Sequence, residues 1–290
     1  MTNTLRANLE FKLAVIILES IGFSATHSIS DMLSMDGTNY VCHGSQNFKK
    51  RTNIGIENLS FPAFFKEMQE LEDEYENCIS VHSAFLPAEI AKTIQGTDAK
   101  FFALTRKSQK EQILSCFFWA VNGFLNGRQD MNDAVTRMHS NLGRQLNEQG
   151  LISNFQTCLM VFAMRRVLIA NVKLGLNAQR VFFMEDVIQD PNSFAIELGL
   201  IKEKDPSLKV HKKASHREKV AGLEFLSDVN GTLDALAKII SVKILEQNYS
   251  IDEAEKLLNQ KASIDANTAP YMGHVSSSLA VNQIPAAKVV

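Results

Sequence analysis

The sequence predicts an α/β protein, a three-layer sandwich in which a central, mostly parallel sheet lies between helices. Two observations lead to this prediction. Short apolar runs alternate with longer amphipathic segments along most of the chain, and continuous apolar runs are typical of strands covered on both faces. Alternation of strand and helix is the pattern of parallel strands joined by right-handed helical crossovers.

The apolar runs place strands at residues 13–18, 39–43, 78–82, 99–105 and 180–184. Helical spacing of apolar residues predicts a helix that begins near Ile29 and further helices at 61–75, 87–94, 110–124, 131–146, 155–174 and 194–198. Two more helical patterns lie between 230 and 261, and Ser250 with Glu253 forms a capping-box pattern before the second.

The composition sets the size of the folded unit. The chain has 290 residues, of which 45% are hydrophobic and 21% charged, as in an ordinary globular protein with a sizeable core. Because α/β folds often reach this length around one sheet, we expect one domain over 1–262. The remainder, 263–290, is rich in Ser, Ala, Asn and Val and has no clear period, so we expect a loosely ordered tail.

Charge and cysteine content limit the partners. The formal net charge of -2 gives no general attraction to nucleic acid or an anionic membrane, so a bound anion needs a local site. Basic residues cluster at 49–51, 165–166 and 209–219, although such runs are usually solvated surface. The four cysteines lie far apart without a Cys-x-x-Cys pair, which favours reduced thiols in a cytoplasmic protein over zinc or disulfides.

The segment between the first strand and its helix, Gly22-Phe-Ser-Ala-Thr-His-Ser28, is a candidate anion site. A small, hydroxyl-rich loop that opens a helix gathers free backbone N–H groups and the positive end of the helix dipole around one point. An ordinary capped turn also favours Ser and Thr. The Gly-Lys-Ser/Thr ending of a Walker loop is missing, which disfavours magnesium-dependent hydrolysis of ATP or GTP.

A second candidate segment, 100–115, leads from a strand into Arg106 and Lys107 and then into a helix with Ser115. At the carboxyl end of a parallel strand these basic residues face the same crevice as the first loop. The two segments could then hold the two ends of one polyanionic nucleotide. The alternative is that the basic pair is only the solvated start of a connection.

Both segments resemble the donor-binding signatures of the sulfotransferase family, whose members transfer a sulfuryl group from 3′-phosphoadenosine 5′-phosphosulfate (PAPS). Two more stretches match in order: 79–87, with His82 before a Pro-containing helix, and 181–191, which resembles a Tyr-Glu-Asp-Leu motif. The Leu198-Gly-Leu200 turn follows. The resemblance extends over about residues 13–200.

The resemblance implies a P-loop-like nucleotide-hydrolase fold, PAPS as co-substrate without a metal, and a small-molecule or glycan acceptor with a hydroxyl or amine. Arg106 or Lys107, with Ser115, then binds the 3′-phosphate. His82 becomes the general base, and His43 is the alternative base or an acceptor contact. The 5′-phosphosulfate loop comprises Gly22, Phe23, Ser24, Ala25, Thr26, His27 and Ser28.

The loop departs from the family pattern at three positions. Phe23 stands where many members carry Lys or Arg, Ala25 where they carry Gly, and His27 where they carry Thr or Ser. A cation from the region of Lys212, Lys213 and Arg217 could supply the missing charge. Arg106 lies one residue further from Ser115 than in the animal cytosolic members, which keeps Lys107 as a rival.

Other residues are expected to be structural. Glu185 and Asp186 should orient their neighbours rather than bind metal, because no second carboxylate cluster completes a site. Met160, Phe162 and Met164 should be helical core rather than an acceptor pocket. Two other functions stay open: a different nucleotide-dependent transferase or kinase, and a degenerate nucleotide-binding relative without turnover.

Overall fold

The computed structural model of the chain describes residues 14–34, 37–44, 46–71, 74–148, 150–211, 228–241 and 250–264. Within them a five-stranded, all-parallel sheet has the order β2-β3-β1-β4-β5, so the predicted α/β class is confirmed. The strands are β1 (Ala14–Glu19), β2 (Asn39–His43), β3 (Asn77–Val81), β4 (Lys100–Thr105) and β5 (Arg180–Phe183).

Strand β1 occupies the centre of the sheet, between β3 and β4. Its residues Ile16, Ile17 and Leu18 are fully buried, as expected for a strand covered on both faces. The chain leaves β1 toward β2 on one side and leaves β3 across β1 toward β4 on the other. Such a reversal opens a crevice at the carboxyl ends of the strands, where α/β proteins bind ligands.

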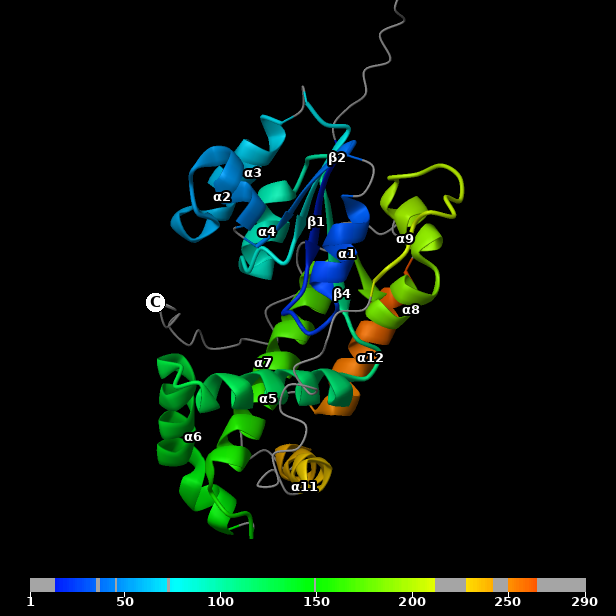
Figure 1. Ribbon diagram of the computed structural model, residues 1–290. Helices are drawn as coiled ribbons and strands as arrows, with labels where there is room; N and C mark the ends of the chain where they lie inside the picture. Colours follow the sequence, from blue (N-terminus) through cyan, green and yellow to red (C-terminus); the bar gives the residue numbers. More distant parts are fainter. Residues whose placement is uncertain are drawn as a thin grey trace, which may run out of the picture.

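Helices cover both faces of the sheet (Figure 1). Ile16 and Leu18 pack toward one face, Val15 and Ile17 toward the other, as the two-residue period of a strand requires. The first face is covered by α1 (Thr26–Leu33), α8 (Met184–Gln189) and α9 (Pro191–Leu198). The second is covered by α2 (Gln46–Thr52), α3 (Phe61–Gln69), α4 (Pro87–Ile94), α12 (Ile251–Ala262) and the last turns of α7 (Phe155–Asn177), with the short 3₁₀ helix η1 (Ile56–Asn58) after α2.

A helical lobe extends beyond the carboxyl ends of the strands (Figure 1). It contains α5 (Gln109–Leu125), α6 (Gln129–Glu148), α7 and α11 (Val229–Ser241) around a third core cluster. Helix α7 belongs to both parts, because its first turns pack in this lobe and Leu174 packs against the sheet. The lobe therefore provides a wall above the crevice.

Several boundaries differ from the prediction. The helix expected over 61–75 ends at Gln69 with Glu70 as its C-cap, which places a negative charge at the negative end of the helix dipole. Strand β5 ends at Phe183, and α8 begins at the next residue, Met184. The sequence analysis predicted neither α8 nor α2. The capping box of Ser250 and Glu253 is present. The expected tail lies outside the described residues apart from Ser263 and Ile264.

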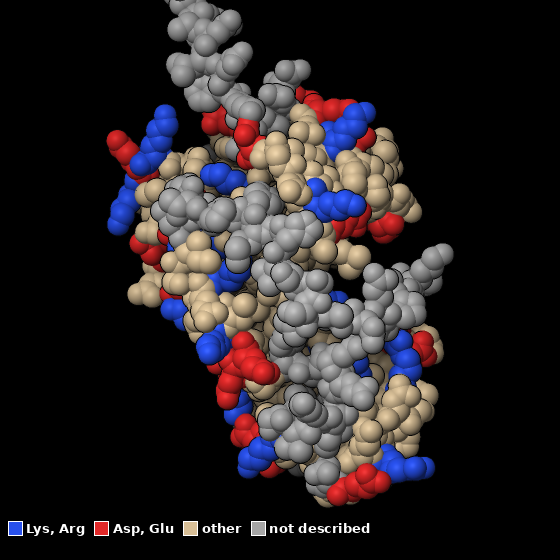
Figure 2. Space-filling model, turned by 180° about the vertical axis from the view of Figure 1, so that it is seen from behind, with Lys and Arg blue, Asp and Glu red and all other residues tan. Residues whose placement is uncertain are grey.

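Surface and cysteine features fit the composition. Basic and acidic side chains are interspersed on the described part of the face in Figure 2. Arg51, from the basic run 49–51, pairs with Glu74 and lies over the rings of Tyr40 and Tyr75.

All four cysteines are buried and free. None of the helices in the described ranges has the length and apolar character needed to cross a bilayer.

Candidate functional site at the carboxyl ends of the strands

The loop after β1 has an unusual backbone. Gly22, Phe23 and Ala25 have φ angles of 87°, 63° and 52°. Ala25 occupies the N-cap position of α1 without a side-chain hydrogen bond to the helix, so no side chain of the cap satisfies the first N–H groups. Successive N–H groups in alternating turn conformations form concave anion sites, which makes this loop a candidate of that kind.

Left-handed backbone is concentrated in two loops. Of the six non-glycine residues with positive φ in the described ranges, Phe23 and Ala25 follow β1, and His82 and Ala84 follow β3. Each such residue costs about 1–3 kcal/mol and persists only where the surroundings enforce it. Since β1 and β3 are neighbours, the strain lies at one place, at the mouth of the crevice.

Gln112 of α5 connects this loop to the end of β4. Its fully buried amide donates to the Gly22 carbonyl at 3.0 Å and to Ser24 Oγ at 2.9 Å. Its carbonyl accepts from Thr105 Oγ1 at 2.7 Å and from Asn171 Nδ2 at 2.8 Å. One side chain thereby holds the two segments that the sequence assigned to the two ends of a nucleotide.

Two further buried amides complete this cluster. Asn171 of α7 donates to Gln109 Oε1 at 2.7 Å, and Gln109 Nε2 donates to the carbonyl of Arg106 at 3.0 Å. Sequence reasoning missed Gln109, Gln112 and Asn171. The available signal was a polar amide inside an otherwise apolar helical segment, which a folded protein buries only with partners.

Arg106 and Lys107 point to different partners. Arg106 Nη1 donates to Ser115 Oγ at 3.0 Å, and its Nε lies 3.4 Å from Glu185 Oε1. Lys107 Nζ instead pairs with Asp186 Oδ1 at 2.5 Å on the surface. The structure thus brings together Arg106 and Ser115 rather than Lys107 and Ser115, and Glu185 and Asp186 contact the two basic residues.

The hydroxyls of the loop are turned inward. Ser24 is fully buried, accepts from Gln112, and donates to the Gly22 carbonyl at 3.4 Å. Thr26 Oγ1 is bonded to His43 Nε2 at 3.0 Å, and Ser28 is buried. His27 is the exposed residue of this stretch. The backbone N–H of Gly22 donates to Ser20 Oγ at 3.1 Å, so in this conformation the loop offers an anion the N–H groups after Gly22 rather than these hydroxyls.

Phe23 does not point into the crevice as a cation would. Its ring meets Trp119 of α5 edge-on at 5.7 Å between centroids. Arg166 of α7 lies over the same indole, with Cζ 5.6 Å from the ring centroid. The Arg166 guanidinium therefore lies near Phe23, the loop position at which a basic residue is missing. Lys212, Lys213 and Arg217 lie outside the described residues.

Three histidines gather where β1, β2 and β3 end. The rings of His27 and His43 are 3.8 Å apart and those of His43 and His82 are 5.8 Å apart. Burial, followed by the charges of His27 and His82, lowers the pKa of His43 to about 4. His43 is consequently neutral at pH 7, and its Nε2 is engaged by Thr26.

Among the residues that the structure describes, one ring nitrogen of His82 has no hydrogen-bond partner and can act as a base. His82 Nδ1 is bonded to the carbonyl oxygen of Ser20. Because a carbonyl only accepts, Nδ1 carries the proton and Nε2 is the basic nitrogen. Burial lowers the pKa of His82, and Arg166 and His27 act in the same direction. Gly22 lies beside this ring with a φ of 87°, a left-handed backbone conformation that favours glycine.

Glu19 holds the loop that carries His82. The carboxylate is 2% exposed and accepts from the backbone N of Ser83 at 2.7 Å, from the Ser83 hydroxyl, and from Ala84 N at 3.3 Å. Burial raises its pKa to about 7, against the lowering effect of these hydrogen bonds. The sequence signal that was missed is a carboxylate that closes an apolar strand.

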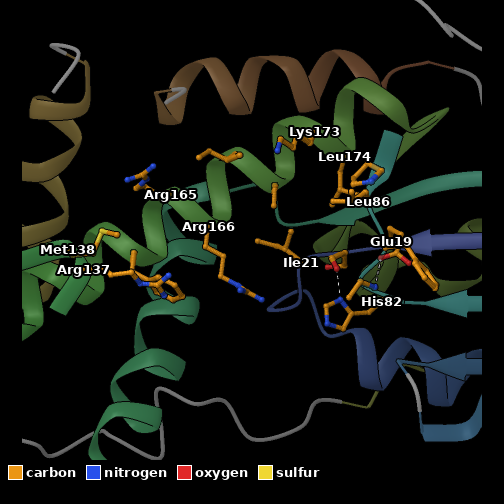
Figure 3. Close-up of a pocket in the computed structure, with 17 residues that line it drawn as sticks. Glu19, Ile21, His82, Leu86, Arg137, Met138, Arg165, Arg166, Lys173 and Leu174 are labelled. Atoms are coloured by element: carbon orange, nitrogen blue, oxygen red, sulfur yellow. Dashed lines mark hydrogen bonds between the residues drawn. The ribbon is translucent and has the colours of Figure 1, made fainter. Parts of the chain in front are cut away.

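A cavity of about 530 Å³ opens beside His82 (Figure 3). Its walls come from residues 19–21 at the end of β1, the loop after β3 and the start of α4, one turn of α6 and one face of α7. Met160 and Met164 are buried core as expected, whereas Phe162 lines the cavity together with Arg165 and Arg166. Phe162 is partly buried and also packs against the core cluster of the helical lobe.

No family model, curated protein or solved structure matches this chain. The resemblance to sulfotransferases therefore rests on the sequence motifs alone. Within the described ranges, no group of three or more His, Cys, Asp or Glu side chains is arranged to hold a metal ion.

Replacing Gln112 with Leu should destabilise the protein by about 3 kcal/mol or more, because it removes four hydrogen bonds of this buried side chain at about 0.5–1.5 kcal/mol each. Urea denaturation measures the loss. The exposed Gln129→Leu is the matched control and should change stability by less than about 0.5 kcal/mol. Equal losses in both variants would contradict the role given to the amide cluster.

Glu19→Gln should flatten the dependence of stability on pH. The unfolded chain loses this proton near pH 4.5 and the folded protein near pH 7, so the native state binds more protons in between. The corresponding stability is present below pH 4.5 and lost as the pH rises through about 7. Melting temperatures of wild type, Glu19→Gln and the exposed control Glu57→Gln across this window test it. The same slope in all three would exclude Glu19 as the source.

Proposed function

We propose that this protein is a sulfotransferase with a P-loop-like fold, which moves a sulfuryl group from PAPS to a hydroxyl or amine acceptor in the cytoplasm. The observation that carries the proposal is the linkage by Gln112 of the loop 22–28 to the end of β4, where Arg106 meets Ser115. A nucleotide with phosphates at both ends requires two such anion sites in one crevice.

In this assignment the Arg106 guanidinium and the Ser115 hydroxyl bind the 3′-phosphate. Glu185 holds Arg106 only at 3.4 Å, and a dianionic phosphate competes well with one partly exposed carboxylate. The N–H groups of the loop 22–28 and the N-terminus of α1 bind the 5′-phosphosulfate. Sulfuryl transfer needs mainly positioning and cationic stabilisation.

His82 is assigned as the general base. The acceptor oxygen or nitrogen attacks sulfur as His82 Nε2 takes the acceptor proton, and the bond from sulfur to the bridging oxygen breaks with its electrons on the leaving phosphate. The products are the sulfated acceptor and 3′,5′-diphosphoadenosine. A neutral imidazole at pH 7 is required, and the lowered pKa of His82 supplies it.

Arg166 is assigned as the cation that the loop lacks at Phe23. Its position over Trp119, the ring that Phe23 contacts, and its influence on His82 support this assignment. The same Phe23 contact favours a second candidate, a nucleotide-binding protein without turnover, because an apolar residue here contributes no charge to the leaving phosphate.

3′,5′-Diphosphoadenosine should bind and raise the melting temperature, because a ligand of the native state stabilises it by mass action. Arg106→Ala should weaken this nucleotide by a factor on the order of 10 or more and leave AMP, which has no 3′-phosphate, nearly unaffected. Calorimetric titration measures both affinities.

Lys107→Ala is the matched control for Arg106→Ala and should bind like wild type. A selective loss in Lys107→Ala alone would move the 3′-phosphate site by one residue. If millimolar 3′,5′-diphosphoadenosine produces no thermal shift, the donor assignment fails, and a shift with ATP and magnesium alone would indicate a kinase instead.

His82→Asn should lower sulfuryl transfer by a factor on the order of 10² or more while the affinity for 3′,5′-diphosphoadenosine stays unchanged. Asparagine tolerates the φ of 57° at this position, which limits structural damage. Transfer to a panel of hydroxyl acceptors is measured beside calorimetric affinity, with His139→Asn on α6 as control. Equal turnover in His82→Asn and wild type would direct attention to His43, and no wild-type turnover would favour the binding protein.

A further inference from the structure

The cavity beside His82 has an unusual charge balance. Four cations line it, namely Arg137, Arg165, Arg166 and Lys173, against one carboxylate, Glu19. Glu19 is largely enclosed by Ser83 and Ala84 and, with a pKa of about 7, carries less than a full negative charge at neutral pH. The cavity therefore has a net positive charge, although the chain as a whole is slightly acidic.

Among the residues that the structure describes, the four cavity cations form no ion pair with a carboxylate, unlike several basic residues elsewhere. Arg51, Lys107, Lys110, Arg128 and Arg180 each form such a pair. The nearest groups that the cavity cations do engage are neutral, such as the Asp133 carbonyl for Arg137 and the Trp119 ring for Arg166.

Apolar side chains form the rest of the wall. Along α7, Phe162, Ile169, Ala170 and Leu174 line the cavity at helical spacing between the cations. The other apolar lining residues are Ile21, Phe85, Leu86, Pro87 and Met138. A sugar chain would leave its hydroxyls without partners on such a surface. The wall suits an aromatic or aliphatic body, and a volume of about 530 Å³ is that of a small-molecule site.

Two of the cavity cations lie at the opposite end of the cavity from the proposed base, His82. Figure 3 shows Arg137 and Arg165 at the opposite end of the lining from Glu19 and His82, with Ile21 and Arg166 between them. A molecule that lies along the cavity with its nucleophile at His82 thus places its far end beside two unpaired arginines.

We propose that the acceptor is an amphipathic hydroxy acid: a hydroxyl at the His82 end, an apolar body along α7, and a carboxylate or similar anion at Arg137 and Arg165. This inference rests on the proposed function for the role of the hydroxyl. The preference for an anionic amphiphile depends only on the cavity and is tested without the donor.

The test compares 5-(4-hydroxyphenyl)pentanoate with 4-pentylphenol, which differ only in a terminal carboxylate or methyl group. Calorimetric titration into the full chain should give about tenfold tighter binding of the carboxylate, because charge-assisted hydrogen bonds to Arg are strong. The double variant Arg137→Gln, Arg165→Gln should remove most of this preference and change 4-pentylphenol binding by less than about twofold.

Arg144→Gln, an exposed substitution on α6 outside the cavity, should bind both probes like wild type. If the double variant does not fold, the single variant Arg137→Gln, at an exposed position, should reduce the preference in part. Equal binding of the two probes by wild type, or a preference that survives the substitutions, overturns the proposal. A carboxylate preference without binding of 3′,5′-diphosphoadenosine supports the cavity assignment and refutes the sulfotransferase.

Discussion

The buried amide of Gln112 is the constraint on which the candidate site depends. Its two donors and its carbonyl bind groups from the loop after β1, from the end of β4 and from α7. Because a buried polar group without a partner is costly, these elements can move only together. The relative position of the loop 22–28 and Arg106 is thus fixed by a side chain that belongs to neither.

Strand β1 supplies the second constraint through its last residue and the one after it. Glu19 accepts from the loop after β3, and the Ser20 carbonyl accepts from His82. These contacts offset the left-handed backbone of His82 and Ala84, at about 1–3 kcal/mol per residue. The hydrogen bonds of Glu19 and of the Ser20 carbonyl hold the strained loop in place, and they fix the His82 imidazole in one tautomer and one orientation.

The sequence was sufficient for the elements and insufficient for the contacts between them. Periodicity located all five strands, and the capping pattern located α12, because these signals are local. The roles of Glu19 and Gln112 were not predicted, because their hydrogen-bond partners lie 64 and 88 residues away in the sequence. Likewise, the choice between Arg106 and Lys107 depends on how the backbone turns from β4 into α5, which side-chain types alone do not encode.

The Arg106 site and the cavity beside His82 are candidate sites for different anions, and their cations are held in different ways. Arg106 is held by Glu185 and Ser115, so its guanidinium is oriented before any ligand arrives, and a phosphate dianion must displace only a weak, partly exposed pair. The cavity cations have no such carboxylate among the described residues, so an anion there meets no competitor but must order long side chains. A guanidinium that is oriented before binding favours specificity for one phosphate geometry. Adaptable cations on an apolar wall instead select ligands by their negative charge and general shape, so they accept more than one molecule.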